Sequence, residues 1–245
     1  MAIGIIGIDC ATQKKNTGLA FGFFENGKVQ IDEVTVGSRE IDLVGMVVEW
    51  INRFESALIA LDAPLGWPVE LGIELTLHEA GEPIENDPNL LFRRGTDRFI
   101  REIIGKQPLD VGADRIARTA YAALRVLGDL RIRTGSPIPL AWEPAQLKST
   151  SAIEVYPAAT LRAHNISVPG YKEKDNDQAR KTMITRLREI MEIPIDTSLI
   201  ERNDNALDAV LCVLAGLDFL SGNDYPPIDL NLAKKEGWIW VRNTR

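Results

Sequence analysis

The sequence predicts an α/β protein in which helices flank one mixed β-sheet. The first part of the chain shows strand patterns separated only by short polar turns, which is typical of an antiparallel meander. Further along, single apolar strands alternate with helical patterns, which is typical of parallel strands joined by helices. We therefore expect an antiparallel half and a parallel half within the same sheet.

The antiparallel half comprises three strands near the N-terminus. Residues 3–9 form a short apolar run, and residues 18–24 form a second one after a polar turn. Glu-Asn-Gly at 25–27 is a hairpin signal, and residues 28–36 alternate as the third strand. The three segments predict a β1-β2-β3 meander.

The parallel half begins after a helix. Residues 40–55 carry apolar side chains at helical spacing, and residues 57–62 are almost entirely apolar, as expected for a strand covered on both faces. Pro64 ends this fourth strand. Residues 151–156 predict the fifth strand.

Between the fourth and fifth strands, residues 66–148 depart from a simple strand–helix alternation. The segment is rich in proline and predicts helices over 95–104 and 112–128. No linker composition bounds it, so we expect a helical insertion, or cap, within a single domain of residues 1–245.

The C-terminal part predicts helices and one late strand. Residues 175–192 form a helix with a polar face. Asn203 or Asp204 caps a long apolar helix that continues through Leu220, and residues 237–241 form a strand.

The bulk composition is that of a soluble globular protein. Of 245 residues, 45% are hydrophobic and 26% are charged, and no apolar run approaches the ~20 residues of a membrane span. Cys10 and Cys212 lie far apart in the sequence without metal-type spacing, and His78 and His164 share no motif. These features favour a cytoplasmic protein without structural disulfides and without a membrane partner; the oligomeric state is left open.

Carboxylates occupy four notable places in the chain. Asp9, Asp62 and Glu154 lie at or near the ends of apolar strands, while Asp204 and Asp208 lie one turn apart on the long apolar helix. Ionised carboxylates are rarely buried unless they are paired or bind a metal. Brought together by the fold, these side chains would form an oxygen-rich pocket for Mg²⁺ or Mn²⁺.

Positive charge is concentrated near the predicted helix at 95–104, although the net charge is −7. The patch consists of Arg93, Arg94, Arg98 and Arg101. We expect the cap to hold Arg94, Arg98 and Arg101 over the acidic pocket, where arginine binds phosphate through paired hydrogen bonds. The alternative is that they pair with Asp97 and Glu102 on a solvated helix.

The element order and six motifs together resemble a known family, the domain-of-unknown-function family 429, whose members are described as predicted nucleases of ribonuclease H-like fold. The motifs occur in order along nearly the full length: Gly-Ile-Asp9, Leu-Asp62-Ala-Pro, Arg-Arg-Gly-Thr-Asp97-Arg, Glu154-Val-Tyr-Pro-Ala-Ala, Asp-Asn-Ala-Leu-Asp208-Ala and Glu-Gly-Trp-Ile-Trp-Val. The resemblance implies a ribonuclease H-like mixed sheet.

The resemblance, and through it the similarity to Holliday-junction resolvases, also implies a site. Asp9, Asp62 and Asp208 are the expected catalytic metal ligands, with Asp204 and Glu154 as further candidates. Asp204 is alternatively a helix cap, because resolvases space their acidic pair i, i+3, and that position here is Asn205. Glu154, with Tyr156, is alternatively a structural partner of the Arg94 region. Thr12 and Lys15 follow Asp9 and join the three arginines as expected substrate contacts.

The function implied is a Mg²⁺- or Mn²⁺-dependent nuclease that acts on nucleic acid of unspecified type. Two alternatives remain open. One is a non-catalytic nucleic-acid or protein binding module; the retained acidic positions argue against it, and the acidic pI keeps it open. The other is an actin-like phosphotransferase, which would need a second such half and a glycine-rich phosphate loop.

Overall fold

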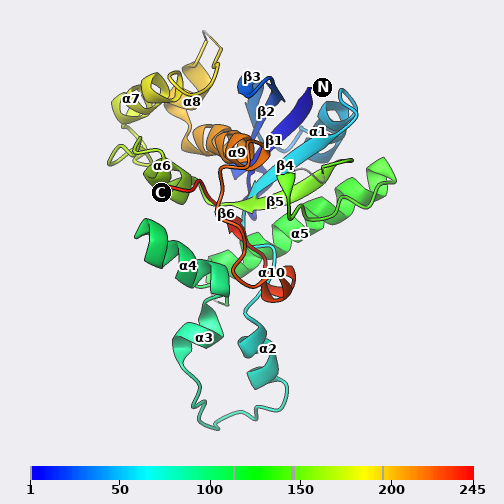
Figure 1. The fold of residues 1–245 in the computed structure, drawn as a ribbon, viewed down its shortest axis with the longest axis vertical. Helices are drawn as coiled ribbons and strands as arrows, with labels where there is room; N and C mark the ends of the chain where they lie inside the picture. Colours follow the sequence, from blue (N-terminus) through cyan, green and yellow to red (C-terminus); the bar gives the residue numbers. More distant parts are fainter. Residues whose placement is uncertain (1, 113, 145–146, 195) are drawn as a thin grey trace.

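A computed structural model describes residues 2–112, 114–144, 147–194 and 196–245. Its sheet has six strands in the order β3-β2-β1-β4-β5-β6 (Figure 1). The strands are β1 (Ile3–Asp9), β2 (Gly18–Glu25), β3 (Lys28–Val36), β4 (Ala57–Asp62), β5 (Ser151–Val155) and β6 (Ile239–Trp240). The predicted mixed sheet, with its antiparallel β1-β2-β3 meander and parallel β4 and β5, is confirmed.

The strand directions divide the sheet at β1. Strands β1, β2 and β3 pair antiparallel, whereas β4 pairs parallel with β1, β5 with β4, and β6 with β5. In the β1–β4 register, Asp9 is opposite Asp62. The two predicted carboxylates therefore end neighbouring parallel strands.

Helices cover both faces of the sheet (Figure 1). Their bounds are α1 (Leu43–Ile51), α2 (Val69–Leu75), α3 (Pro88–Phe92), α4 (Gly95–Ile104), α5 (Asp114–Thr134), α6 (Pro157–Ala163), α7 (Asp177–Leu187), α8 (Ser198–Arg202), α9 (Asp204–Leu220) and α10 (Leu230–Glu236), with a 3₁₀ turn, η1, at Lys14–Asn16. The described part of the chain includes no helix that is both long and apolar enough to cross a membrane.

Several helix ends differ from the expected ones for local reasons. Helix α1 begins late because the Asp42 carboxylate caps it, accepting a hydrogen bond from the Gly45 amide at 3.1 Å. Helix α5 continues beyond the predicted residue 128, since Leu130 keeps its apolar face in the core. Gly135, at φ +63°, follows the end of α5.

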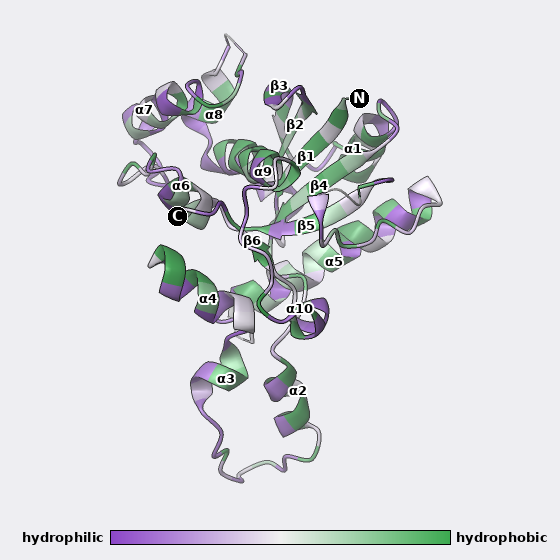
Figure 2. Ribbon diagram, in the orientation of Figure 1, coloured by the Kyte–Doolittle hydropathy of each residue, from purple (hydrophilic) through white to green (hydrophobic). Residues whose placement is uncertain are grey.

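The two faces of the sheet have separate cores. Helix α9, apolar along most of its length (Figure 2), packs with α7 against the face that carries Ile5 and Ile31. Helices α1 and α5 pack against the face that carries Ile6, Ile8 and Leu61. Because side chains alternate along β1, Asp9 points to the α9 face and Ile8 to the α5 face.

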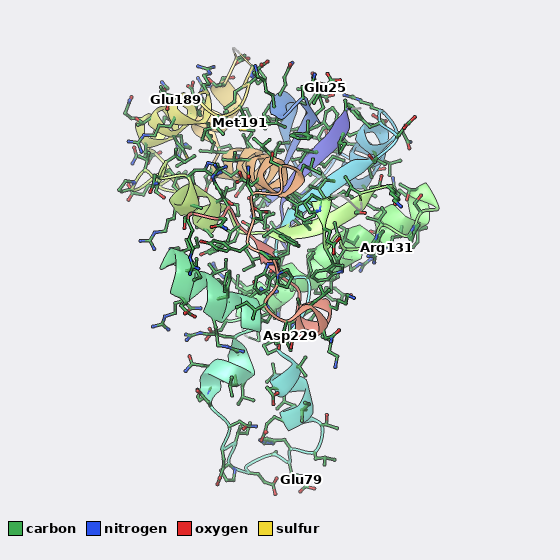
Figure 3. The ribbon with its side chains drawn as sticks, in the orientation of Figure 1. Glu25, Glu79, Arg131, Glu189, Met191 and Asp229 are labelled. Carbon is green, nitrogen blue, oxygen red and sulfur yellow. The ribbon has the colours of Figure 1, made fainter. Side chains whose placement is uncertain are left out.

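The segment expected to be a cap contains two different parts. Helices α2 and α3 and the loop between them project away from the sheet, with Glu79 near the end of this arm (Figures 1 and 3). Helix α5 instead contributes Ala123, Leu127 and Leu130 to the core. At least α5 is therefore an integral layer of the domain.

Glycines let α9 approach the sheet closely. A Cβ at Gly7 on β1 would lie 2.0 Å from the Ala209 carbonyl oxygen, and a Cβ at Gly18 on β2 would lie 2.0 Å from the Asn205 carbonyl oxygen. No side chain fits either gap. These contacts fix the N-terminal half of α9 directly over β1 and β2.

We predict that Gly7→Ala lowers the free energy of unfolding by roughly 1–3 kcal/mol or more, because the added methyl displaces α9. Gly128→Ala is the matched control. Its Cβ would meet nothing within 4 Å, and Ala favours a helix interior by up to about 1 kcal/mol. Urea denaturation measures both. Equal stability of Gly7→Ala and wild type would contradict the packing argument.

Candidate metal centre

Three carboxylates from three different elements meet at one end of the sheet. Asp9 ends β1, Asp62 ends β4, and Asp208 lies near the start of α9. One carboxylate oxygen from each lies within 4.8 Å of the other two. We call these three residues the carboxylate trio. The fold has brought together the three acids that the sequence singled out as catalytic ligands.

Asp208 is held by two residues that the sequence analysis missed. Its side chain is 2% exposed. The Tyr171 hydroxyl donates to Oδ1 at 3.1 Å, and the Lys172 ammonium lies 2.5 Å from Oδ2. Both residues belong to an irregular segment between α6 and α7. Such a segment has no periodicity, so nothing in the sequence marked them.

The environment of the trio resists ionisation. Burial, reinforced by the Asp62 and Asp208 carboxylates, raises the pKa of Asp9 to about 9. Burial and the Asp208 carboxylate raise the pKa of Asp62 to about 7. Burial also raises the pKa of Asp208, even though Lys172 opposes that shift. The trio therefore lies in a buried site that has too little positive charge nearby to favour the ionised form of all three carboxylates.

This donor set fits a hard divalent cation. All three potential ligands are carboxylate oxygens, which Mg²⁺ and Mn²⁺ prefer over nitrogen and sulfur. The adjoining hollow of about 380 Å³ is lined by Asp9, Asp62, Lys106, Tyr156 and Lys172, among others. Access for a small ion and for a phosphate group is thus available beside the trio.

Arg94 and Glu154 form a separate, buried ion pair. The Arg94 guanidinium donates to both Glu154 carboxylate oxygens at 2.7 and 2.9 Å and to both Asp97 oxygens at 2.9 and 3.1 Å. Glu154 also accepts from the Leu65 amide at 2.9 Å, and Arg94 donates to the Glu236 carbonyl at 3.0 Å. The pair therefore links β5, α4 and the residues after β4.

This arrangement differs from two expectations. The Arg94 guanidinium is buried, and its hydrogen-bond donors are taken by protein acceptors instead of being free for a phosphate; burial alone would lower its pKa, but Glu154 and Asp97 raise it. The Glu154 oxygens accept hydrogen bonds from Arg94 and Leu65, and Glu154 lies outside the trio. Glu154 therefore makes the structural contact with Arg94 that was the alternative to a role as metal ligand.

The remaining candidates lie around the site in different ways. Asn203 caps α9 by accepting from the Ala206 amide at 3.0 Å, so Asp204 is not the cap, and it lies in the first turn outside the trio. Arg98 donates to the Arg93 carbonyl at 2.5 Å and to the Asn89 carbonyl. Three candidates are exposed: Arg101, Thr12 and Lys15.

The sequence of the chain was compared with those of known proteins. A family model described as "Protein of unknown function (DUF429)" matches residues 7–230. The chain belongs to this family. No curated protein matches it.

A comparison of structures finds RuvC of T. thermophilus, solved in complex with a Holliday junction substrate. The two are 13% identical, with 88% of this chain and 97% of the RuvC chain covered and a TM-score of 0.32. So distant a likeness says nothing about the activity of this DUF429 protein.

We predict that the buried ion pairs of Arg94 with Glu154 and Asp97 stabilise the fold. Arg94→Ala should lower the free energy of unfolding by about 3–5 kcal/mol, because it leaves Glu154 and Asp97 buried without their cation. The control is Arg101→Ala on the exposed side of α4, which should change it by less than about 0.5 kcal/mol. Denaturant titration measures both. A stable Arg94→Ala protein would contradict the structural role.

We also predict that the stability of the metal-free protein depends on pH. Asp9 binds its proton more tightly in the folded chain than in the unfolded one, because its pKa rises from 3.8 to about 9. The metal-free wild type therefore loses stability relative to Asp9→Asn as the pH rises from 5 to 9. Near pH 5 the two should melt at similar temperatures, and at pH 8 the variant should melt higher.

Thermal melting in EDTA across this range tests the prediction, and added Mn²⁺ should reverse the order at pH 8 by stabilising only the wild type. If the difference in melting temperature between the two proteins did not change with pH, the raised pKa assigned to Asp9 would be contradicted.

Proposed function

We propose that this DUF429 protein is a divalent-metal-dependent nuclease that hydrolyses phosphodiester bonds in nucleic acid. One observation carries the proposal: Asp9, Asp62 and Asp208 converge within 4.8 Å from two parallel strand ends and a helix. When all three carboxylates are ionised, their negative charge exceeds the single positive charge of Lys172. A pair of Mg²⁺ or Mn²⁺ ions would supply the positive charge that compensates them.

The residues of the site have distinct roles in this proposal. Asp9, Asp62 and Asp208 would hold the metal ions, which when bound activate water and stabilise the leaving oxygen. Tyr171 positions the Asp208 carboxylate through its hydroxyl. Lys172, with its ammonium 2.5 Å from Asp208 and its side chain 55% exposed, can move to a substrate phosphate. No histidine is needed as a general base.

The rival functions are less well supported. A phosphotransferase of the actin-like class requires a glycine-rich loop after the first strand, and residues 10–15 contain no glycine. A module that only binds would not require three partly or fully buried carboxylates within 4.8 Å of one another, which cost stability without a cation. The free cysteines Cys10 and Cys212 are consistent with the reducing conditions of a cytoplasmic location.

We predict that wild-type protein cleaves labelled nucleic acid with Mn²⁺ or Mg²⁺ and not with EDTA. Asp9→Asn and Asp208→Asn should each reduce cleavage by at least about 10³-fold, because each removes a metal ligand. Asp32→Asn, at an exposed carboxylate on β3, is the matched control. The substrates are single-stranded and duplex DNA, RNA and a four-way junction.

Metal titration by calorimetry provides a readout independent of turnover. Mn²⁺ should bind the wild type without ATP and should fail to bind Asp9→Asn at the same concentration. Cleavage that persists in EDTA, or undiminished cleavage by Asp9→Asn, would contradict the nuclease assignment. Mn²⁺ binding only with ATP would favour the phosphotransferase.

A further inference from the structure

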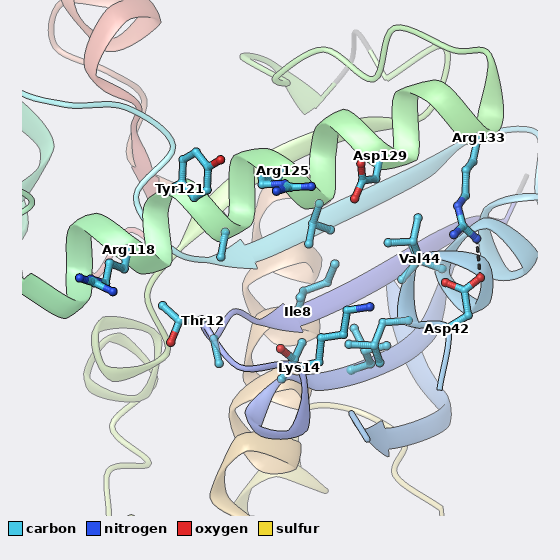
Figure 4. Close-up of a pocket in the computed structure, with 17 residues that line it drawn as sticks. Ile8, Thr12, Lys14, Asp42, Val44, Arg118, Tyr121, Arg125, Asp129 and Arg133 are labelled. Atoms are coloured by element: carbon cyan, nitrogen blue, oxygen red, sulfur yellow. Dashed lines mark hydrogen bonds and ion pairs between the residues drawn. The ribbon is translucent and has the colours of Figure 1, made fainter. Parts of the chain in front are cut away.

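A second hollow lies on the other face of the sheet from Asp208, between α5, α1 and the segment that follows β1 (Figure 4). Its volume is about 590 Å³. We call it the α5 groove. Arg118, Tyr121 and Arg125 lie along its α5 side, while Thr12 and Lys14 lie across from them. Apart from Thr12, which the sequence predicts as a substrate contact, none of the site residues discussed above lines this surface.

The α5 groove has an excess of positive charge available for a ligand. Residues 118, 121, 125 and 129 follow helical i, i+3/i+4 spacing, so they share one face of α5. Within the described part of the chain, no carboxylate lies within ion-pair distance of Arg118, Arg125 or Lys14. Arg133 is different, because it pairs with Asp42 at the far end (Figure 4). Asp129 offsets only part of this charge.

The floor of the α5 groove is apolar, which decides between two forms of nucleic acid. The floor consists of Ile8, Leu19, Leu43, Val44, Val47 and Val126. Tyr121 stands at its edge with 62% of its surface exposed. A duplex keeps its bases stacked inside and presents phosphates, which need no apolar floor. A single strand presents both, and aromatic side chains bind its bases by stacking.

The α5 groove adjoins the metal centre through shared elements. Ile116 and Thr119, on the N-terminal half of α5, line the hollow beside Asp9 and Asp62. Across from α5, Cys10 lines the hollow beside the trio, and the next residue, Ala11, lines the α5 groove. A strand that follows α5 therefore passes from the cationic side chains to the carboxylate trio. Between Arg118 and Arg125 it follows about 10 Å of helix.

From these contacts we propose that the α5 groove binds a single strand of nucleic acid, with Arg118, Arg125 and Lys14 on its phosphates and Tyr121 against a base. This inference rests on the proposed nuclease function and adds the form of the substrate and the path it takes. Cationic contacts to phosphate make the affinity depend on salt, with a slope of about −0.7 for each contact to a single strand.

The test is binding of a fluorescent single-stranded oligonucleotide to the full chain in EDTA, followed by anisotropy over a range of salt concentrations. Arg118→Ala/Arg125→Ala should bind at least about ten-fold more weakly, with a salt slope smaller by about 1.4. Tyr121→Ala should lower the affinity without changing the slope. The control is Lys28→Ala/Lys148→Ala, which removes the same charge at the opposite end of the sheet from Asp9.

Cleavage kinetics with Mn²⁺ provide the second readout. The arginine variant should raise KM and leave kcat within about two-fold, since neither arginine touches the reacting phosphate. All these side chains are exposed, so thermal melting should match the wild type and exclude unfolding.

Wild-type binding by the arginine variant would overturn the proposal, as would tighter binding of duplex than of single strand. If Asp9→Asn still abolished cleavage in either case, the nuclease function would stand while the groove assignment fell. If the wild type neither bound nor cleaved any nucleic acid with Mn²⁺, both would fall.

Discussion

The close packing of α9 on β1 and β2 is the contact on which the rest of the site depends. Helix α9 carries Asp208, and only its short distance from the sheet places that carboxylate beside Asp9. Gly7 and Gly18 permit this distance because their missing Cβ atoms leave room for backbone carbonyls of the helix. A larger residue at either position would separate Asp208 from Asp9 and Asp62 without changing any acidic residue.

Two groups of buried carboxylates lie near one another and are neutralised in opposite ways. Glu154 and Asp97 share the Arg94 guanidinium, which satisfies them within the protein. Among the described residues, the partly exposed Lys172 is the one cation paired with the trio, and burial together with mutual repulsion raises the pKa values of Asp9 and Asp62. A buried acid with a permanent partner serves structure, whereas a buried acid that lacks one is available for a ligand.

Much of the fold could be predicted from the sequence because its signals are local. The hairpin glycine at 25–27, the apolar strand at 57–62 and the helical pattern after Asn203 each depend on neighbours in the chain. Asp9 and Asp62 were identified for the same reason, since a carboxylate at the end of an apolar strand is unusual. The limits of α1 and α5 were not predicted, because a cap and a distant core contact set them.

The sequence by itself determined the order of strands and helices along the chain, the acidic positions and membership of the DUF429 family. Only the tertiary structure separated the functions of similar residues. It paired Glu154 with Arg94, left Asp204 outside the trio, and brought Tyr171 and Lys172 to Asp208 from an irregular segment. The physical reason is that the charge state and availability of a side chain depend on its burial and its partners, and those partners lie far away in the sequence.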